Sequence, residues 1–218
     1  MNRIIITLIL IVIGFQLTAQ TFREEGKETE RSGEIETLFS KHRSISGYGQ
    51  FDLNTTKLLN QTGLILGGQG GIILDKMYQI GLGGYGISTP IRLEMQTPGN
   101  NYELVGGYGG LALGYIFKPT KPVHITLPLF LGIGGLDVID RQVIYSPDQQ
   151  WEDNSIERTM FYVVEPGAML QLNITRFFRL AVGAGYRLTY GVNLDASGIK
   201  DEDTSGMSYN VSFKFGNF

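Results

Sequence analysis

A strict alternation of bulky apolar residues with other residues is the clearest pattern in this chain. Between Val123 and Ile133 every odd position holds Val, Leu or Ile, whereas the even positions hold His, Thr, Pro, Phe and Gly. A period of two is that of a β-strand, because successive side chains of a strand point to opposite faces. We therefore predict that 123–135 is a strand with one aliphatic face and one mixed face of small and polar residues.

Seven other segments alternate in a similar way, so the pattern predicts eight strands. Segment 178–190 is as regular as 123–135, with mostly bulky apolar residues opposed to Arg, Ala, Gly and Thr. Short connections alternate with longer ones, as expected when tight turns lie at one end of a barrel and loops at the other. The expected strands are 43–54, 61–74, 77–88, 102–117, 123–135, 158–173, 178–190 and 207–218, and the longest loop, 137–157, contains Trp151.

Strands of about 9 to 11 residues, even in number and apolar on one face, are typical of transmembrane β-barrels. The sequence thus predicts an all-β fold, an eight-stranded antiparallel transmembrane β-barrel in up-and-down meander order, with its aliphatic faces outward. Aromatic residues near the strand ends fit the girdles of such barrels. The alternative is a soluble barrel or sandwich with the apolar faces inward. It is disfavoured because the opposite faces mix Gly, Tyr, Gln and charged residues, a composition too apolar for a wet surface and too polar for a core.

The first 42 residues lack the alternation and divide into two parts. Arg3 precedes a short apolar run, 4–15, and the small residue Ala19 follows, which is the order of a cleaved secretory signal peptide over residues 1–19. The run is shorter than the ~20 residues of a membrane-spanning helix. The charged residues 20–42 are expected to form a periplasmic N-terminal extension. The predicted domains are therefore 1–19, 20–42 and the barrel, 43–218.

Composition excludes several classes of partner and of covalent or metal chemistry. The formal net charge is −3, with 18 basic and 21 acidic residues, so no basic excess is available to bind nucleic acid. The absence of cysteine excludes disulfides, thiolate metal sites and the lipid-bearing cysteine of a lipoprotein. The 30 glycines lie within strand-like segments. We expect them to make room in a small lumen for Tyr48, Tyr85, Tyr108 and Phe130.

Several segments resemble a known group of proteins. These are the signal ending LTAQ, the segment GEIETLFSKHRSISGYGQF, the block GLILGGQGGIILDKMYQIGLGGYG and the final strand SYNVSFKFGNF. Together they resemble the small eight-stranded outer-membrane β-barrel proteins of Gram-negative bacteria, of the OmpA/OmpX type and as found in Bacteroidota. The resemblance implies a location in the cell outer membrane. It also implies an assembly signal in Phe213, Phe215 and Phe218, although Phe218 is out of phase with the other two, which implies a bulge or a modified signal.

Two motifs suggest ligands but lack essential parts. Residues 81–86 match the dinucleotide pattern G-x-G-x-x-G, but Ser88-Thr89-Pro90 follow instead of the helix N-terminus that binds a pyrophosphate. Residues 201–206 resemble the start of a calcium-binding loop, but the twelfth position is Ser212 instead of a bidentate Glu. We therefore predict neither a cofactor nor a metal site.

A lipid hydrolase or acyltransferase at the outer rim would need a histidine base beside its nucleophile. The chain has two histidines, His42 and His124, and both map to the short-turn side. We therefore predict no catalytic residues and expect that the protein is not an enzyme.

Charged residues at inward positions are expected to form a lumenal polar network. Glu165 and Arg187 are equidistant from Arg176 in the turn between their strands, so they should lie opposite each other and form a direct ion pair. Side chains fill the interior of an eight-stranded barrel, so the role of the network is expected to be structural. Its predicted members are Asp52, Glu165, Arg179, Arg187 and Lys214.

These features predict a non-enzymatic outer-membrane barrel with a side-chain-filled lumen and a structural or interaction role, such as an accessory subunit of an envelope complex. Two alternatives stay open: a small-solute pore or transport-associated barrel, and a barrel enzyme that modifies outer-leaflet lipid. The expected partners are outer-membrane lipid, the outer-membrane assembly machinery and a protein partner in a larger membrane complex.

Overall fold

The computed structural model describes residues 44–93, 102–140 and 154–218. The predicted signal peptide 1–19, the predicted extension 20–42, His42 and Trp151 lie outside the described residues. No helix among the described residues is long and apolar enough to cross a bilayer.

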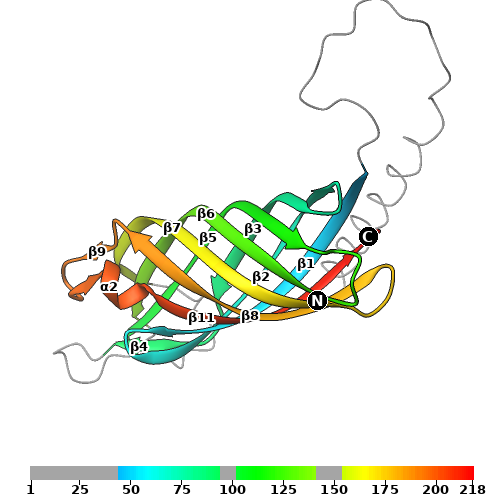
Figure 1. Ribbon diagram of the computed structural model, residues 1–218. Helices are drawn as coiled ribbons and strands as arrows, with labels where there is room; N and C mark the ends of the chain where they lie inside the picture. The colour runs from blue at the N-terminus through cyan, green and yellow to red at the C-terminus, as the bar shows by residue number, and fades with distance from the viewer. Residues whose placement is uncertain (1–43, 94–101, 141–153) are drawn as a thin grey trace, which may run out of the picture. The chain divides into compact units, whose positions relative to one another are not determined.

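Nine strands form one antiparallel sheet. Sequence neighbours pair with one another, β1 also pairs with β11, and β3 also pairs with β5, so the sheet closes on itself (Figure 1). The short strand β4 follows β3 and pairs with the same partner, β5. The two together therefore count as one of the eight strands of the barrel wall. The strands are β1 (Ile45–Leu58), β2 (Gln61–Leu74), β3 (Tyr78–Ile87), β4 (Ile91–Leu93), β5 (Tyr102–Phe117), β6 (Val123–Asp140), β7 (Asn154–Asn173), β8 (Phe178–Tyr190) and β11 (Gly206–Gly216). The chain therefore forms a closed, eight-stranded antiparallel barrel in meander order, as predicted.

The two ends of the barrel differ. The connections 75–77, 118–122 and 174–177 and the C-terminus lie at one end, which we call the turn end. The connections 59–60 and 191–205, the end of β4, the start of β5, the end of β6 and the start of β7 lie at the other, the loop end. The connection 191–205 contains the small hairpin of β9 (Asn193–Leu194) and β10 (Ile199–Lys200) and the single helical turn α2 (Asp201–Thr204), which Figure 1 shows at the end opposite the C-terminus.

Backbone conformation explains the two tightest connections. Leu59 and Asn60 have φ of 51° and 60°, and Asp75 and Lys76 have φ of 51° and 61°. Positive φ at both central residues is typical of type I′ hairpin turns, whose twist matches that of the flanking strands. The predicted turn at Asp75-Lys76 is therefore confirmed.

Three predicted boundaries were wrong. Residues 55–58 were expected in a loop but belong to β1, because Thr56 and Leu58 continue the inward face and are 4% and 3% exposed. The predicted loop 137–157 is shorter, since β6 runs to Asp140 and β7 begins at Asn154. Inward and outward positions of β6 alternate up to Val138, but the outward positions 135 and 137 hold Gly and Asp instead of aliphatic residues, so the apolar signal ends before the strand does. A register shift follows between Val138 and Ile139.

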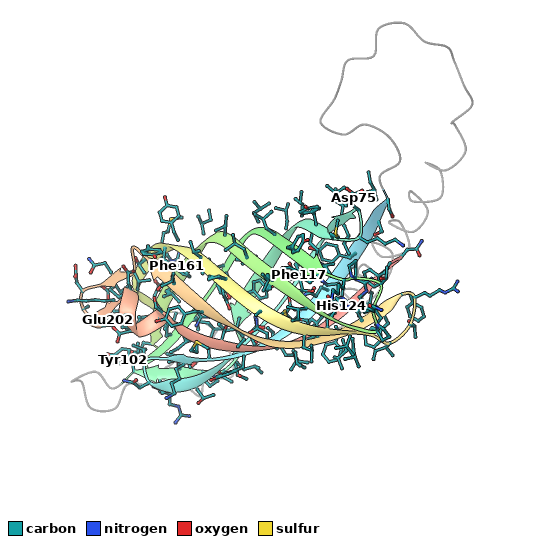
Figure 2. The ribbon with its side chains drawn as sticks, viewed as in Figure 1. Asp75, Tyr102, Phe117, His124, Phe161 and Glu202 are labelled. Atoms are coloured by element: carbon teal, nitrogen blue, oxygen red, sulfur yellow. The ribbon has the colours of Figure 1, made fainter. Side chains whose placement is uncertain are left out.

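The aliphatic faces point outward. Leu127 and Val182 are 42% and 47% exposed, whereas Arg179 and Arg187 on β8 are 4% and 3% exposed. Figure 2 shows side chains projecting from the outer surface of the barrel wall. The soluble alternative with an inward aliphatic core is thereby excluded for this structure, because the charged faces are the buried ones.

Candidate functional site

The lumen is filled by side chains and is apolar at the loop end. Buried residues from several strands and from the connection 191–205 form one cluster there. Leu104, Val138 and Leu194 are each 0% exposed, so the β9–β10 hairpin is part of this core instead of lying free in solvent. The cluster comprises Leu58, Ile65, Ile91, Tyr102, Leu104, Tyr108, Ala112, Phe130, Leu136, Val138, Phe161, Val163, Val192, Leu194 and Ile199.

Hydrogen bonds hold the connection 191–205 on this end. Arg187 Nε donates to the carbonyl of Thr204 at 3.2 Å, and the Thr189 and Thr204 hydroxyls lie 2.7 Å apart. The predicted calcium-like acids cap the backbone instead of facing a common point. Asp201 Oδ1 accepts from the Val192 N–H at 2.7 Å, and Asp203 Oδ2 accepts from the Lys200 N–H at 2.9 Å. Within the described ranges, no three His, Asp or Glu side chains form a group suited to a metal ion.

An aromatic layer lies next to the apolar cluster. The rings of Tyr85 and Tyr108 stack with centroids 5.2 Å apart, and Phe130 meets both edge-on at 5.2 and 5.6 Å. A Cβ at Gly67 would lie 2.1 Å from the Tyr85 ring, and one at Gly134 would lie 2.7 Å from Tyr108. The glycines therefore leave space for these rings. The G-x-G-x-x-G segment is part of this wall, because it lies in β3.

Neutral donors surround the carboxylate of Asp52, which is 3% exposed. Tyr85 Oη donates to Oδ2 at 2.8 Å, while Ser212 Oγ and Gln50 Nε2 donate to Oδ1 at 2.5 and 2.6 Å. Gln69 Nε2 lies 3.5 Å from Oδ2. Within the part of the chain that the structure describes, the carboxylate is thus satisfied without contact to a cation.

Glu165 has the same kind of environment. Tyr108 Oη donates to Oε2 at 3.2 Å and Ser208 Oγ to Oε1 at 2.5 Å. A cavity of about 40 Å³ lies beside both carboxylates, and its lining includes Asp52 and Glu165. Polar cavities need only about 10–15 Å³ to hold a water molecule, so this one has room for water rather than for an organic substrate.

The predicted pairing of Glu165 with Arg187 is half right. The ladder pairs on either side, Val164 with Leu188 and Gly167 with Gly185, give the register that was expected. However, Arg187 Nη2 donates to Thr56 at 2.9 Å, and the contacts of the described residues include no ion pair to Glu165. The ion pair does not form because Arg187 points toward the loop end, where it donates hydrogen bonds to the Thr204 carbonyl and to the Thr56 hydroxyl.

The remaining predicted cations lie toward the turn end, and among the described residues neither forms an ion pair with Asp52 or Glu165. Arg179 and Lys214 are each 4% exposed and are directly paired across β8 and β11. The Arg179 guanidinium carbon lies 3.8 Å from the centre of the Phe218 ring, and Lys214 Nζ lies 5.2 Å from that of Tyr48. All five predicted residues thus face the lumen, but they form separate groups.

The aromatic residues of the last strand point in different directions. Phe213 and Phe215 remain on the outward face of β11, and Phe215 is 50% exposed. The strand ends at Gly216, after which Phe218 turns inward and packs against Tyr48, Ile73 and Ile116. Its phase difference therefore reflects the end of the strand and not a bulge, since the pairings of β11 show no register shift. Whether these residues form an assembly signal stays a prediction.

His124 lies at the turn end, as its sequence position predicted. It begins the inward face of β6, is 4% exposed, and its Nδ1 lies 3.3 Å from the Lys121 carbonyl. It is therefore far along the strand from the loop end, where β6 finishes at Asp140.

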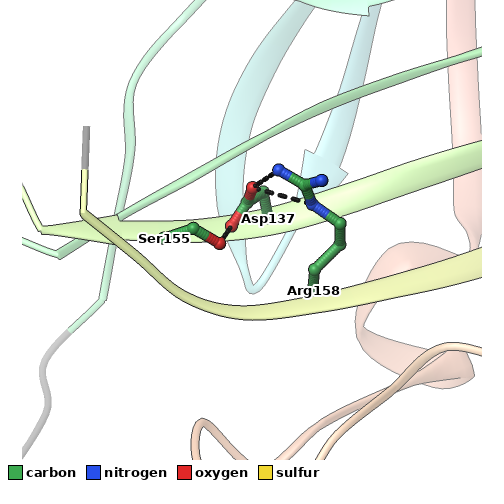
Figure 3. Close-up of polar contacts among 3 residues, drawn as sticks. All are labelled: Asp137, Ser155 and Arg158. Carbon is green, nitrogen blue, oxygen red and sulfur yellow. Dashed lines mark hydrogen bonds and ion pairs between the residues drawn. The ribbon is translucent and has the colours of Figure 1, made fainter. Parts of the chain in front are cut away.

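The loop end also carries an exposed polar contact between β6 and β7. Arg158 Nη2 lies 2.7 Å from Asp137 Oδ2, and Ser155 Oγ donates to Asp137 Oδ1 at 2.7 Å (Figure 3). Because the Arg158 side chain is 71% exposed, this pair adds little stability. It does connect the extended ends of the two longest strands.

Sequence reasoning placed Tyr85 and Tyr108 in the lumen but missed their hydrogen bonds to the carboxylates and missed both serines. Ser208 and Ser212 are 0% and 1% exposed and share the inward face of β11 with Lys214. Counting back from Lys214 in steps of two would have placed both serines in the lumen. Their acceptors could not be found in this way, because they lie on β1 and β7.

Comparisons with known proteins give similarities of fold only. No family model matches the chain, and no curated protein matches it. The solved structure of Neisserial surface protein A aligns with a TM-score of 0.45 at 13% identity, over 82% of this chain and 100% of that one. A major outer membrane protein of Thermus thermophilus gives 0.44 at 8% identity over 78% and 99%. The attachment invasion locus protein Ail of Yersinia pestis gives 0.38 at 14% identity over 81% and 99%. Because these scores are below 0.5, the assignment of this chain as a closed eight-stranded antiparallel barrel rests on its own strand pairing.

Proposed function

We propose that the protein is a non-enzymatic barrel of the cell outer membrane, with a plugged lumen and a structural or interaction role. The observation that carries this proposal is the inverted distribution of residues: charged side chains are buried and large apolar ones cover the wall. The outward residues with at least 40% exposure include Phe51, Ile72, Ile80, Leu82, Ile125, Leu127, Ile133, Leu170 and Val182. In water, such a continuous apolar surface would be far larger than a monomeric protein tolerates.

The height of the apolar wall supports a membrane-spanning role. On β8, Phe178 lies at the turn end and Tyr190 at the loop end. Twelve steps of ~3.3 Å, at a strand tilt of ~40°, give a height of about 30 Å, close to the hydrocarbon thickness of a bilayer. Exposed aromatic residues flank this height: Tyr78, Phe117, Phe177 and Phe215 toward the turn end, and Tyr162, Tyr186, Tyr190 and Tyr209 toward the loop end.

The filled lumen favours a plug over a pore. The apolar cluster and the β9–β10 hairpin occupy the loop end, and Phe218 with Tyr48, Ile73 and Ile116 occupies the turn end. Purified protein inserted in a planar bilayer should therefore give no unitary conductance steps, whereas a porin inserted in parallel gives them. Regular current steps from the wild-type barrel would contradict the proposal and favour the small-solute pore.

A partner protein would supply a more specific role. The loop end extends beyond the apolar wall, and the exposed Asp137–Arg158 pair lies there. If the barrel is an accessory subunit of an envelope complex, purification in mild detergent should give a stoichiometric partner that a charge-reversed variant, Arg158→Glu, retains less well. Purification of the wild type as a free barrel from native membranes would contradict the accessory-subunit role.

The lipid-modifying enzyme remains the third reading and has its own test. His124 is buried at the turn end, on the proposed periplasmic side, away from the outer leaflet. Incubation of the folded barrel with lipopolysaccharide and phospholipid should leave the acyl chains unchanged by mass spectrometry. Release or transfer of an acyl chain would overturn the non-enzymatic assignment.

A further inference from the structure

We propose that the lumen near the turn end binds a small inorganic anion, a halide or an oxyanion, between Arg179 and Lys214. Both side chains point inward, and each is 4% exposed. They are directly opposed, since β8 and β11 pair Arg179 with Lys214. The Cβ atoms of directly opposed residues are only about 5 Å apart, and like charges there repel each other. A compensating negative charge would therefore stabilise this arrangement.

The interior carboxylates do not provide that charge by contact. Asp52 is diagonal to Lys214, because it pairs with Ser212, but Tyr85, Gln50 and Ser212 already donate to its oxygens. Among the residues that the structure describes, no carboxylate forms an ion pair with Arg179 or Lys214. Asp52 thus reduces the positive potential at longer range but leaves the Arg179 Nε and Nη1 without an acceptor.

The Arg179 guanidinium has unused donors. Its Nε and Nη1 are buried and have no hydrogen-bond acceptor in the described protein. One face of the group is covered by the Phe218 ring at 3.8 Å, and Lys214 Nζ lies 5.2 Å from the Tyr48 ring. Ring contacts offset only part of the desolvation cost of a buried cation. They do not accept hydrogen bonds from the N–H groups in the guanidinium plane. The edge of the guanidinium therefore has donors left for an anion.

The residues next to this pair are neutral. Gln171 is 0% exposed, and Thr126 Oγ1 donates to its Oε1 at 2.8 Å. His124 is its direct partner on β6, and the Nε2 atoms of both residues are buried. His124 Nδ1 lies 3.3 Å from a backbone carbonyl, so a neutral ring presents Nε2 as an acceptor for the Gln171 amide and not as a donor to an anion. The guanidinium edge and the ammonium therefore form the donor set for a small anion.

The surroundings restrict the size of the anion. Phe218 covers Arg179 from the turn end, and its ring packs against Tyr48, Ile73 and Ile116. Ile73 and Ile116 are 1% and 0% exposed. An organic anion with a bulky tail does not fit among these side chains, so the assigned occupant is a halide or a free oxyanion such as phosphate.

Anion-dependent thermal stability tests the site. The complete mature protein, folded in a non-ionic detergent, is unfolded in sodium bromide, sodium phosphate or sodium gluconate at equal ionic strength, and gluconate serves as the anion that is too large. Bromide or phosphate at ~100 times its dissociation constant should raise the Tm by roughly 5–10 °C relative to gluconate. A rise in bromide alone identifies a halide site, and a rise in phosphate alone an oxyanion site.

Variants separate the site from general salt effects. Arg179→Met should abolish the anion-dependent rise, whereas Arg158→Met, at an exposed arginine of the loop end, should keep it. If Arg179→Met does not fold, Lys214→Met serves instead and should likewise lose the rise. Equal Tm values in the three salts, or the same rise in both arginine variants, would overturn the proposal.

Bromide-soaked crystals locate the ion directly. The expected result is an anomalous peak within hydrogen-bond reach of the Arg179 Nε or Nη1 and of Lys214 Nζ. A map in which these atoms contact only water or the C-terminal carboxylate would overturn the assignment, whatever peaks occur on the outer surface.

Discussion

Hydroxyl and amide groups, instead of cations, balance the two carboxylates at the centre of the lumen. Asp52 accepts hydrogen bonds from Tyr85, Ser212 and Gln50, and Glu165 accepts them from Tyr108 and Ser208. A hydrogen bond to a charged group stabilises more than one between neutral groups, so these acceptors hold aromatic rings and strands in place. The network therefore joins side chains from several strands across the lumen.

Replacement of Asp52 should destabilise the barrel. Asp52→Leu leaves the buried donors of Tyr85 and Ser212 unpaired, and we expect the free energy of unfolding to fall by about 2–4 kcal/mol. Urea unfolding in lipid vesicles, followed by electrophoretic mobility, measures the loss. Glu202→Leu, at an exposed acid of α2, is the control and should change stability little. Equal stability of the two variants would show that the network does not stabilise the fold.

The space around two glycines differs and gives a second prediction for single residues. A Cβ at Gly67 would lie 2.1 Å from the Tyr85 ring and 2.4 Å from a backbone oxygen, whereas a Cβ at Gly49 meets nothing within 4 Å. Gly67→Ala should therefore cost about 1–3 kcal/mol of unfolding free energy through overpacking, and Gly49→Ala should be nearly neutral. The same unfolding assay compares them, and a neutral Gly67→Ala would contradict the packing of Tyr85 in the lumen.

At the scale of the element, the connection 191–205 acts as a folded cap. Leu194 and Ile199 are 0% and 2% exposed, and Thr204 is 2% exposed. The strand β8 binds this cap through Arg187 and Thr189. A loop with its own hairpin and helical turn in the core is ordered by burial, even though its sequence looks hydrophilic.

A charged residue in the cap should detach the cap from the apolar cluster of the lumen. Leu194→Asp places an unpaired carboxylate in the apolar cluster, which is strongly unfavourable. We expect cleavage within 191–205 by an added protease to become at least tenfold faster, while the barrel still resists unfolding in detergent. Asn193→Asp, at the neighbouring exposed position, should leave the cleavage rate unchanged. Similar rates for both variants would show that the cap is open in the wild type.

For the whole molecule, the proposed membrane location depends on the outward orientation of the aliphatic faces. Val182 is 47% exposed near the middle of β8, and Thr55 is exposed on the same outward side near the loop end of β1. In a bilayer, Val182→Arg should cost about 2–4 kcal/mol, and Thr55→Arg about 0–1 kcal/mol, because the penalty falls toward the interface. Unfolding from lipid vesicles measures both. A cost for Val182→Arg within about 0.5 kcal/mol, as at an ordinary wet surface, would contradict the proposed membrane location.

Periodicity alone determined most of the fold of this protein. The bounds of β2, β5 and β8 coincide with the predicted segments 61–74, 102–117 and 178–190, because a one-residue shift would move every side chain to the wrong face. The same rule placed Asp52, Glu165, Arg179, Arg187 and Lys214 in the lumen. It missed the end of β6, because the outward positions 135 and 137 hold Gly and Asp instead of the aliphatic residues that mark the rest of the strand.

Tertiary structure alone decided which interior groups meet. Closure of the barrel brings Ser212 of the last strand to Asp52 of the first, 160 positions away along the chain, and the sequence order contains no signal for that contact. It also turned Arg187 toward the cap and left Arg179 beside Lys214. A strand pattern specifies the face on which a side chain lies, whereas rotamers and the curvature of the closed wall select its partner among several at similar distance.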